Sequence, residues 1–426
     1  MKLMAGVARE IISPEVGGFL FGYNDHQVSH SIHDDLTVTA LVLESGKTKL
    51  LLLSATVCLI HNTLSDEIRL KAGEAAAVPA EQVILNATHT HSGPRTDGFS
   101  RWGAVDRPYC DNILIPKCIA AARAASSKLQ PVKTGIGTTE SLVGINRRQL
   151  LRDGRVILGQ NPWDIYDPTM TVITLVGENE KPLANIVHVG AHCTAAGINH
   201  EVTRDWAGVM IDRLDKESGG MTLFLNGTAG DVAPRMANGG STGDIHHAME
   251  VGGLAGIDAV RAFKSIRTFR EEELAFTLGE IKLPFVPAIP AADIQPQLAA
   301  LGENWSWQRF SLERLAALYE AGDLGPEALT FQQTVICLGP VALVPFPFET
   351  SSEIGLRLRH YSPYAHTLLI SYANGSNSYL PAQSQLCRGG YEVESFRWFR
   401  PRQLPENADT LLIEKNLQLL ESILAK

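Results

Sequence analysis

The stretch NATHTHSGP, residues 86–94, places His89 and His91 directly after the apolar run VIL. In an extended segment, residues two apart point to the same side, so both imidazoles would converge on one face. They would do so at the end of a strand, where α/β proteins place their binding sites. His-x-His is a recurrent pairing of zinc ligands, so the pattern predicts a metal site if further ligands exist elsewhere. The alternative is two hydrogen-bonded histidines in a loop.

A second pair of histidines lies in NIVHVGAHCTAAG, residues 185–197. His188 and His192 share a parity in a strand-like run, so either could face a site. His192 stands beside small residues that leave room for a metal or a substrate. His188 lies deeper in the apolar run, and we expect it to be a hydrogen-bonded core histidine. Cys193 has the opposite parity and is expected to be a small buried thiol.

Two segments nearer the C-terminus could add oxygen ligands. In PFPFETSSEIGLRLRH, residues 345–360, Glu349 ends an apolar strand and precedes a helix. Its carboxylate could bind a metal, or it could stabilise the N-terminus of the helix. Tyr379 and Tyr391 lie in SYANGSNSYLPAQSQLCRGGYEVES, residues 371–395, a loop-like segment that contains several Gly and Asn residues and one Pro. Loop tyrosines with buried hydroxyls are common, so residue type alone does not separate a site from ordinary packing.

The elements that must position these residues alternate between strands and helices. This alternation predicts a mixed α/β fold of β-sheets flanked by helices. Strands are expected at 36–60 (a hairpin around SGK), 81–88, 170–176, 184–191, 221–226, 328–339 and 341–346, and helices at 62–78, 108–128, 206–217 with Asp205 as N-cap, 350–360 and 408–426.

We expect residues 1–426 to form a single catalytic domain. Residues 281–330 change character, because a Pro-rich segment is followed by a helical stretch to residue 322. Such an excursion predicts a lid or an inserted subdomain rather than a linker. Its aromatic residues Trp305, Trp307 and Phe310 could close over a small ligand or could pack in the core.

The composition argues against several classes of partner. The 426 residues are 45% hydrophobic and 19% charged, as in ordinary globular proteins, and carry a formal net charge of -9. An acidic balance argues against nucleic acid or an anionic membrane as the main partner. No apolar run is long enough to cross a bilayer, and the N-terminus lacks the apolar segment of a signal peptide. The six cysteines are scattered, as expected for reduced thiols of a cytoplasmic protein.

Taken together, these motifs resemble the catalytic domain of the neutral/alkaline (non-lysosomal) ceramidase family. The resemblance spans most of the chain, and NATHTHSGP is its most specific part. The other matching motifs are GVAREIISP (6–14), GINRRQL (144–150), AHCTAAG (191–197), RDWAG (204–208), NGTAGDVAP (226–234) and the spacing from Tyr379 to YEVES (391–395).

The resemblance implies one zinc ion per chain, held by two histidines, a glutamate and a tyrosine. Carried over by motif, these ligands are His89, His192, Glu349 and Tyr379. His91 would be the acid/base residue, and Arg147 and Tyr391 would contact the substrate carbonyl. Zinc lowers the pKa of bound water, so the implied chemistry is hydrolysis of an amide by metal-activated water.

Two departures from the family pattern bear on the substrate. Ala233 replaces the serine of the family's Gly-Asp-x-Ser-Pro turn, and Thr56 stands at an acidic position. In the family, the serine is thought to act as nucleophile or to bind the sphingoid head, so its replacement weakens the case for ceramide. The family's C-terminal immunoglobulin-like domain and secretion signal have no counterpart in the sequence. We therefore expect a short intracellular branch of the family.

We expect a zinc-dependent amidohydrolase that acts on a small-molecule N-acyl or ester substrate, without a nucleic-acid partner or stable membrane association. An esterase or lactonase using the same zinc site is an alternative, as is a metal-binding protein without turnover. His91, Arg147 and Tyr391 argue against the last, because a purely structural zinc does not need them. Two nitrogen ligands also suit other divalent metals, so zinc is favoured rather than required.

Overall fold

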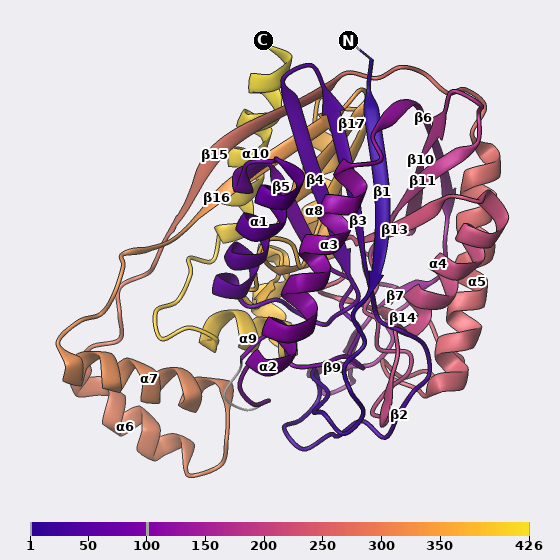
Figure 1. The fold of residues 1–426 in the computed structure, drawn as a ribbon. Helices are drawn as coiled ribbons and strands as arrows, with labels where there is room; N and C mark the ends of the chain where they lie inside the picture. Colours follow the sequence, from indigo (N-terminus) through magenta and orange to yellow (C-terminus); the bar gives the residue numbers. More distant parts are fainter. Residues whose placement is uncertain (1, 99–101, 426) are drawn as a thin grey trace.

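The largest element of the fold is an eight-stranded mixed sheet (Figure 1). The computed structural model describes residues 2–98 and 102–425. In sheet order the strands are β13 (Met221–Asn226), β11 (Pro182–Val189), β10 (Thr169–Gly177), β6 (Gln130–Glu140), β1 (Met4–Ile11), β3 (Thr37–Ser45), β4 (Thr48–Ala55) and β5 (Val83–Ala87).

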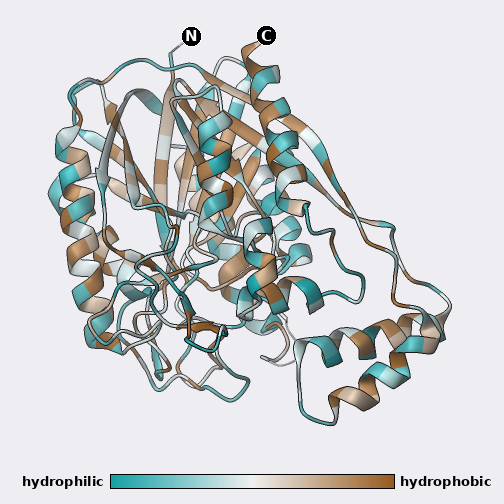
Figure 2. Ribbon diagram, turned by 180° about the vertical axis from the view of Figure 1, so that it is seen from behind, coloured by the Kyte–Doolittle hydropathy of each residue, from teal (hydrophilic) through white to brown (hydrophobic). Residues whose placement is uncertain are grey.

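The sheet folds back on itself between β1 and β6, which pair only at Met4–Pro131 and Ala5–Gln130. Strand β13 consequently packs against β3, β4 and β5, and leucine and isoleucine side chains of both halves form one buried core. Figure 2 shows hydrophobic residues concentrated on these central strands, with hydrophilic residues on the outer helices. The ends of β5 and β13, which are far apart in sheet order, are thereby brought together.

Helices cover the outer face of each half of the sheet. On one half α1 (Asn62–Ala76) and α3 (Ile115–Ser126) lie side by side, and on the other half α4 (Asp205–Ser218) packs on α5 (Ile245–Ser265). The pairs β4–β5 and β11–β13 are parallel and are connected through α1 and α4, as parallel neighbours require. A short helix α2 (Arg107–Tyr109) and a π-turn (Cys110–Leu114) precede α3.

A second sheet packs against the same central core. Its strands, in order, are β15 (Leu274–Pro284), β16 (Ala328–Leu338), β17 (Val341–Pro345) and β19 (His366–Ile370). Helices α8 (Ser352–Tyr361) and α10 (Ala408–Leu424) contact this sheet, and α9 (Tyr391–Trp398) lies near its end. A 3-10 turn (Gln383–Arg388) precedes α9, and another (Ala80–Gln82) precedes β5.

Four short strand pairs connect the loops at the end of the sheets where the candidate residues lie. These are β2 (Ser31–Ile32) with β12 (Glu201–Val202), β7 (Gly144–Asn146) with β14 (Val232–Pro234), β8 (Arg148–Leu150) with β9 (Val156–Leu158), and β18 (Glu349–Thr350) with β20 (Tyr379–Leu380). The pair β8–β9 is a local hairpin, but the other three pairs join segments distant in the sequence, so this end of the molecule is a network of cross-linked loops.

A helical hairpin extends from the main body between β15 and β16 (Figure 1). It consists of α6 (Ala291–Leu301) and α7 (Trp307–Ala321), with a small core around Ile294, Leu312 and Leu315. Helix α7 contacts α9, and Ser311 Oγ donates a hydrogen bond to Arg400 O at 2.7 Å. The hairpin is therefore anchored on the helix that carries Tyr391.

The α/β class predicted from the sequence is confirmed, and each predicted strand and helix has a counterpart in the structure. The predicted start of the inserted segment is wrong by several residues, since 281–284 complete strand β15 and the helices occupy 291–321. That this segment works as a lid remains a prediction. Among the described residues, none of the helices has both the length and the apolar character needed to cross a membrane.

Strand β6 and helix α5 were not foreseen, because glycines interrupt both patterns. Gly137 of β6 faces α5, and a Cβ atom there would lie 2.0 Å from the carbonyl oxygen of Ala262. A strand interior normally disfavours glycine, but here its lack of a side chain allows the helix to approach closely.

We expect Gly137→Ala to destabilise the protein by roughly 1–3 kcal/mol, the usual cost of overpacking. Gly253 of α5 is the matched control, because a Cβ there meets no described heavy atom within 4 Å. Gly253→Ala should stabilise the protein by roughly 0.5–1 kcal/mol, since alanine favours helix. Urea unfolding measures both effects, and equal stability of Gly137→Ala and the wild type would contradict the close approach.

Candidate metal centre

His89 and His91 follow strand β5, but not in the extended geometry that their spacing predicts. That prediction is wrong, because β5 ends at Ala87 and His89 has a left-handed backbone with φ of 75°. A left-handed conformation is uncommon for a residue other than glycine and is often found at functional sites. The two imidazoles nevertheless converge, with Nε2 of His91 3.2 Å from Nε2 of His89.

His192 is brought beside this segment by the folding-back of the large sheet. Thr90 and Cys193 form a parallel β-bridge between the two loops. At the end of β13, Asn226 Nδ2 donates to Thr88 O at 3.0 Å and to Ala191 O at 3.1 Å. One buried amide therefore holds both histidine-bearing loops.

Glu349 and Tyr379 come from the short pair β18–β20 and are direct neighbours. Strands β18 and β20 run parallel with Glu349 in register with Tyr379, and Glu349 N donates to Ser378 O at 3.0 Å. The loop before β20 is conformationally restricted, since Ser378 has a φ of 65°. The carboxylate and the phenol thus reach the site from adjacent short strands.

The hydrogen bonds of the two histidines determine which ring nitrogens face the site. Nδ1 of His89 lies 2.8 Å from Cys58 O, and Nδ1 of His192 lies 2.6 Å from Ala229 O. Because a carbonyl only accepts, each Nδ1 carries the proton and each Nε2 presents a lone pair. Burial and the Arg147 cation lower the pKa of His192 to about 3, so it stays neutral.

Three electron-pair donors therefore face one another. Glu349 Oε2 lies 3.3 Å from Nε2 of His89 and 3.2 Å from Nε2 of His192, and it has no hydrogen-bond donor among the described residues. Atoms bound to one tetrahedral zinc at about 2.0–2.1 Å stand roughly 3.3–3.4 Å apart. The spacing and the chemistry of these atoms fit a divalent cation between them.

Tyr379 occupies the fourth position of this group. Its hydroxyl lies 3.4 Å from Nε2 of His192 and accepts a hydrogen bond from Arg147 Nη2 at 3.0 Å. Burial raises the pKa of the phenol well above its usual value, while the Arg147 cation opposes that rise. A metal charge is therefore needed to make this phenol an anionic ligand. His89, His192, Glu349 and Tyr379 are called the ligand group below.

His91 lies beside the ligand group. Burial and the neighbouring imidazoles of His89 and His192 hold the pKa of His91 well below its usual value, so it is neutral at pH 7. Its Nδ1 is buried without a hydrogen-bond partner in the described part of the chain. Gly22 makes room for the ring, since a Cβ at Gly22 would lie 2.4 Å from Nδ1.

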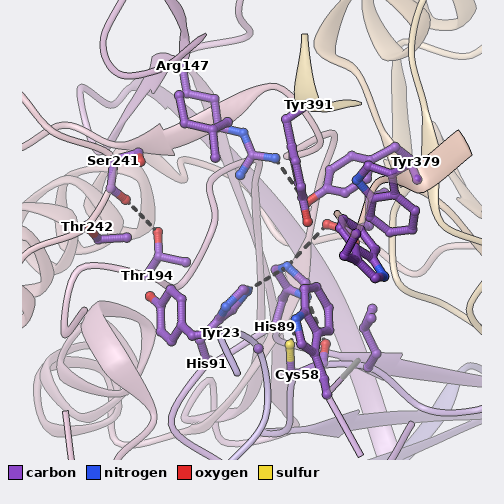
Figure 3. A pocket seen from close by; sticks show the side chains of 17 residues that line it. Tyr23, Cys58, His89, His91, Arg147, Thr194, Ser241, Thr242, Tyr379 and Tyr391 are labelled. Carbon is purple, nitrogen blue, oxygen red and sulfur yellow. Dashed lines mark hydrogen bonds and ion pairs between the residues drawn. The ribbon is translucent and has the colours of Figure 1, made fainter. Parts of the chain in front are cut away.

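The ligand group opens into a cavity of about 220 Å³ (Figure 3). One side carries the hydroxyl residues Thr194, Ser241 and Thr242, which lie across the cavity from Tyr379 in Figure 3. Apolar residues also line it, and these include Leu59, Trp102, Leu158, Trp305 and Trp307. The cavity therefore has a polar part and an aromatic part beside the ligand group.

Arg147 and Tyr391, predicted to contact the substrate carbonyl, both line this cavity. Two nitrogens of Arg147 are already engaged, since Nε donates to Glu392 Oε1 at 2.8 Å and Nη2 donates to Tyr379. The Tyr391 ring lies edge-on to the Tyr379 ring, 5.4 Å away. Contact of either residue with a substrate remains a prediction.

The structural alternatives raised for the other residues can now be resolved. His188 is a core histidine whose Nε2 lies 2.8 Å from Leu369 O, and Cys193 is a buried thiol that donates to Thr88 O. Ala233 is fully buried in β14, and Thr56 exchanges hydrogen bonds with the backbone of Thr37. These four positions support the structure around the cavity.

Several residues in contact with His89 and His91 were not foreseen. Tyr23 lies against His91 with ring centroids 4.9 Å apart, and Tyr372 stacks on His89 at 4.0 Å. Cys58 Sγ lies 3.7 Å from Nδ1 of His89. None belongs to a spacing pattern, so only the positive φ of Tyr372 and the glycine before Tyr23 mark them as unusual.

Asp205 organises the loop that carries His192. It is the first residue of α4, not the N-cap that the sequence predicts, and has a φ of 58°. Its carboxylate accepts hydrogen bonds from the backbone N–H groups of Ala195, Ala196 and Trp206 at 2.6–3.1 Å. The Trp206 indole in turn donates to His192 O at 2.8 Å.

Burial raises the pKa of Asp205 from 3.8 to about 6, against the lowering effect of its three backbone hydrogen bonds. A carboxyl whose pKa is higher in the folded state stabilises the fold fully below pH 3.8 and loses this contribution as the pH rises through about 6. The wild type should therefore lose roughly 2–3 kcal/mol relative to Asp205→Asn between about pH 4 and 7.5. Paired unfolding curves across this range measure the difference, and a pH-independent difference would contradict the assignment.

Comparisons with known proteins place this geometry in context. No family model matches the chain. The neutral ceramidase of Pseudomonas aeruginosa is 27% identical over 243 residues, which are 52% of this chain and 35% of that protein. The matched segment thus spans about a third of the relative.

Solved structures agree with this sequence match over a longer stretch. A ceramidase complexed with C2 superposes with a TM-score of 0.76 at 18% identity, over 100% of this chain and 76% of that one. The crystal structure of Pseudomonas aeruginosa neutral ceramidase gives a TM-score of 0.75 at 20% identity, over 99% and 75%. The chain is therefore a homologue of neutral ceramidase and has the ceramidase fold along its length.

Proposed function

We propose that this protein is a zinc-dependent hydrolase that cleaves the C–N amide bond of a compact N-acyl compound. One observation carries the proposal: two unprotonated Nε2 atoms, one carboxylate oxygen and one phenol stand 3.2–3.4 Å from their neighbours in a buried group. The two Nε2 atoms and the carboxylate oxygen have no proton between them, so these three electron-pair donors repel one another unless a cation is present. The homology to neutral ceramidase supports amide hydrolysis.

The ligand group would hold the zinc ion, and the hydrogen bonds made by the opposite ring nitrogens of its two histidines suit that task. The protonated Nδ1 atoms of His89 and His192 bind backbone carbonyls, which keeps both Nε2 atoms available. When bound, zinc would lower the pKa of a water molecule towards neutrality and polarise an acyl carbonyl.

His91 would move the proton. It is neutral at pH 7, and its Nε2 lies 3.2 Å from Nε2 of His89, on the edge of the ligand group. From there it can accept a proton from the attacking water and return it to the leaving amine nitrogen. An amine is a poor leaving group until it is protonated, so this second transfer distinguishes amide from ester cleavage.

Tyr391 and Arg147 would stabilise the negative charge that develops on the carbonyl oxygen. We assign the hydrogen bond to the Tyr391 hydroxyl, because two nitrogens of Arg147 already bind Tyr379 and Glu392. Arg147 contributes its buried positive charge, which acts strongly because the cavity limits solvent screening.

The cavity favours a compact substrate. Its volume of about 220 Å³ is smaller than the roughly 300–1,000 Å³ of pockets that enclose drug-sized ligands. A long hydrocarbon chain would gain about 0.8 kcal/mol per buried CH₂ only if an apolar channel enclosed it. Ala233 is fully buried and offers no hydroxyl, whereas Thr194, Ser241 and Thr242 offer polar groups at another side of the cavity.

We expect protein purified without chelator to contain about one zinc per chain, as one ligand group implies. His89→Ala should lose the metal, because a ligand is removed. His91→Ala is the matched comparison at the neighbouring histidine: it should keep zinc and lose roughly 10²–10⁴ in rate. Elemental analysis and a hydrolysis assay measure the two effects.

Metal-free wild-type protein with undiminished activity would contradict the zinc assignment. Equal metal loss in both variants would show that the roles of the two histidines are misassigned. Zinc-loaded wild type that turns over neither amides nor esters would identify a metal-binding protein without catalysis.

We expect kcat/KM to be higher for short-chain N-acyl amines than for long-chain ceramide in detergent micelles, because the cavity is compact. Short-chain esters of matched size serve as a control for the bond that is cleaved. Faster cleavage of the esters with no amide turnover would indicate the esterase or lactonase alternative. A preference for long-chain ceramide of about tenfold, or about 1.4 kcal/mol, would contradict the compact substrate.

A further inference from the structure

A buried cluster of two arginines and one glutamate lies directly behind Tyr379. Glu392 Oε1 accepts a hydrogen bond from Arg147 Nε at 2.8 Å, and Glu392 Oε2 accepts one from Arg148 Nη1 at 2.7 Å. The three side chains are only 6%, 2% and 1% exposed for Arg147, Arg148 and Glu392. Arg147, Arg148 and Glu392 are called the arginine–glutamate cluster below.

We propose that Glu392 is a positioning residue that orients Arg147 towards Tyr379 and thereby controls how firmly the ligand group retains its metal. This inference rests on the proposed function, since it concerns the same site. Neither the sequence motifs nor the proposed reaction assigns a role to Glu392.

The contacts of Arg147 leave its side chain little freedom. A guanidinium can rotate about its side-chain bonds, but Arg147 is restrained at Nε by Glu392, and its Nη2 then reaches the Tyr379 hydroxyl at 3.0 Å. The backbone of Arg147 is restrained as well, because its N–H donates to Asp231 O at 2.8 Å. Glu392 therefore restricts the orientation of the Arg147 guanidinium, which donates a hydrogen bond to Tyr379.

Glu392 is itself firmly placed. It is the second residue of α9, where the helix dipole favours a carboxylate. Arg148 binds the other oxygen and also donates to Gly389 O at 2.6 Å, just before the helix. A carboxylate that uses both oxygens on two different arginines has a single orientation.

The charges of the arginine–glutamate cluster also hold Arg147 in place. Two guanidinium groups and one carboxylate are buried together, so removing Glu392 would leave two cations without their shared counter-ion. An unpaired buried cation is strongly unfavourable, so Arg147 would move away from Tyr379 towards solvent or water. The ligand Tyr379 would then lose the hydrogen bond that orients it.

The experiment compares zinc loss from three variants of the full chain. Glu392→Gln keeps the size of the side chain but can accept from only one arginine. Arg148→Met removes one anchor and leaves the Arg147–Glu392 pair. Asp409→Asn is the matched control, because Asp409 is also 1% exposed and pairs with Arg357 at 2.7 Å outside the described cavity lining.

We expect Glu392→Gln to lose zinc to a fluorescent chelator on the order of tenfold faster than the wild type, as when an outer partner of a metal ligand is removed. Arg148→Met should also lose zinc faster than the wild type, but by a smaller factor. This variant provides the test if Glu392→Gln does not fold. Asp409→Asn should lower stability but leave the rate of zinc loss unchanged. In Glu392→Gln, kcat should fall more than KM rises.

Zinc loss from Glu392→Gln and Arg148→Met at the wild-type rate would overturn the positioning role and leave the proposed function intact. Equal acceleration by Asp409→Asn would also overturn it, because any buried ion pair would then suffice. A wild type that binds no zinc would overturn the proposed function and this inference together.

Discussion

The site depends on two hydrogen bonds from histidine side chains to backbone carbonyls. Nδ1 of His89 donates to Cys58 O and Nδ1 of His192 donates to Ala229 O, so both Nε2 atoms turn lone pairs towards Glu349. Without these carbonyls, either imidazole could carry its proton on Nε2 and donate to the carboxylate, and the group would be a neutral hydrogen-bond network. With them, the protein presents a set of electron-pair donors whose chemistry fits a cation.

This arrangement couples the site to the folding of the whole molecule. His89 follows β5, His192 follows β11, and Glu349 and Tyr379 lie on the pair β18–β20 beside the second sheet. No two of the three elements are adjacent in sheet order, and they meet because the large sheet folds back at β1 and β6. A metal held there would join the two halves of the sheet and the second sheet, so its binding energy would also stabilise the fold.

The cavity combines this group with walls of different character. Its hydroxyl residues come from the loops after β11 and β14, and its tryptophans come from the helical hairpin and from the segment after β5. The hairpin is attached through α7 to α9, the helix that carries Tyr391 and Glu392. One short helix, α9, therefore links the residues that would determine substrate specificity to those that would orient the metal ligands.

The sequence by itself determined most of the element types, though not those of β6 and α5, and the identity of the candidate residues. His89 and Glu349 could be named because each follows or ends an apolar run, and Tyr379 because it lies in a loop segment. A family resemblance then ordered them into a ligand set. Tertiary structure alone decided the rest. The β-bridge between Thr90 and Cys193 and the ion pairs of Glu392 join residues across long sequence separations. The left-handed backbone at His89 is a conformation that no spacing pattern encodes. Local periodicity records which face of a strand is buried, but not which distant loop that strand will meet.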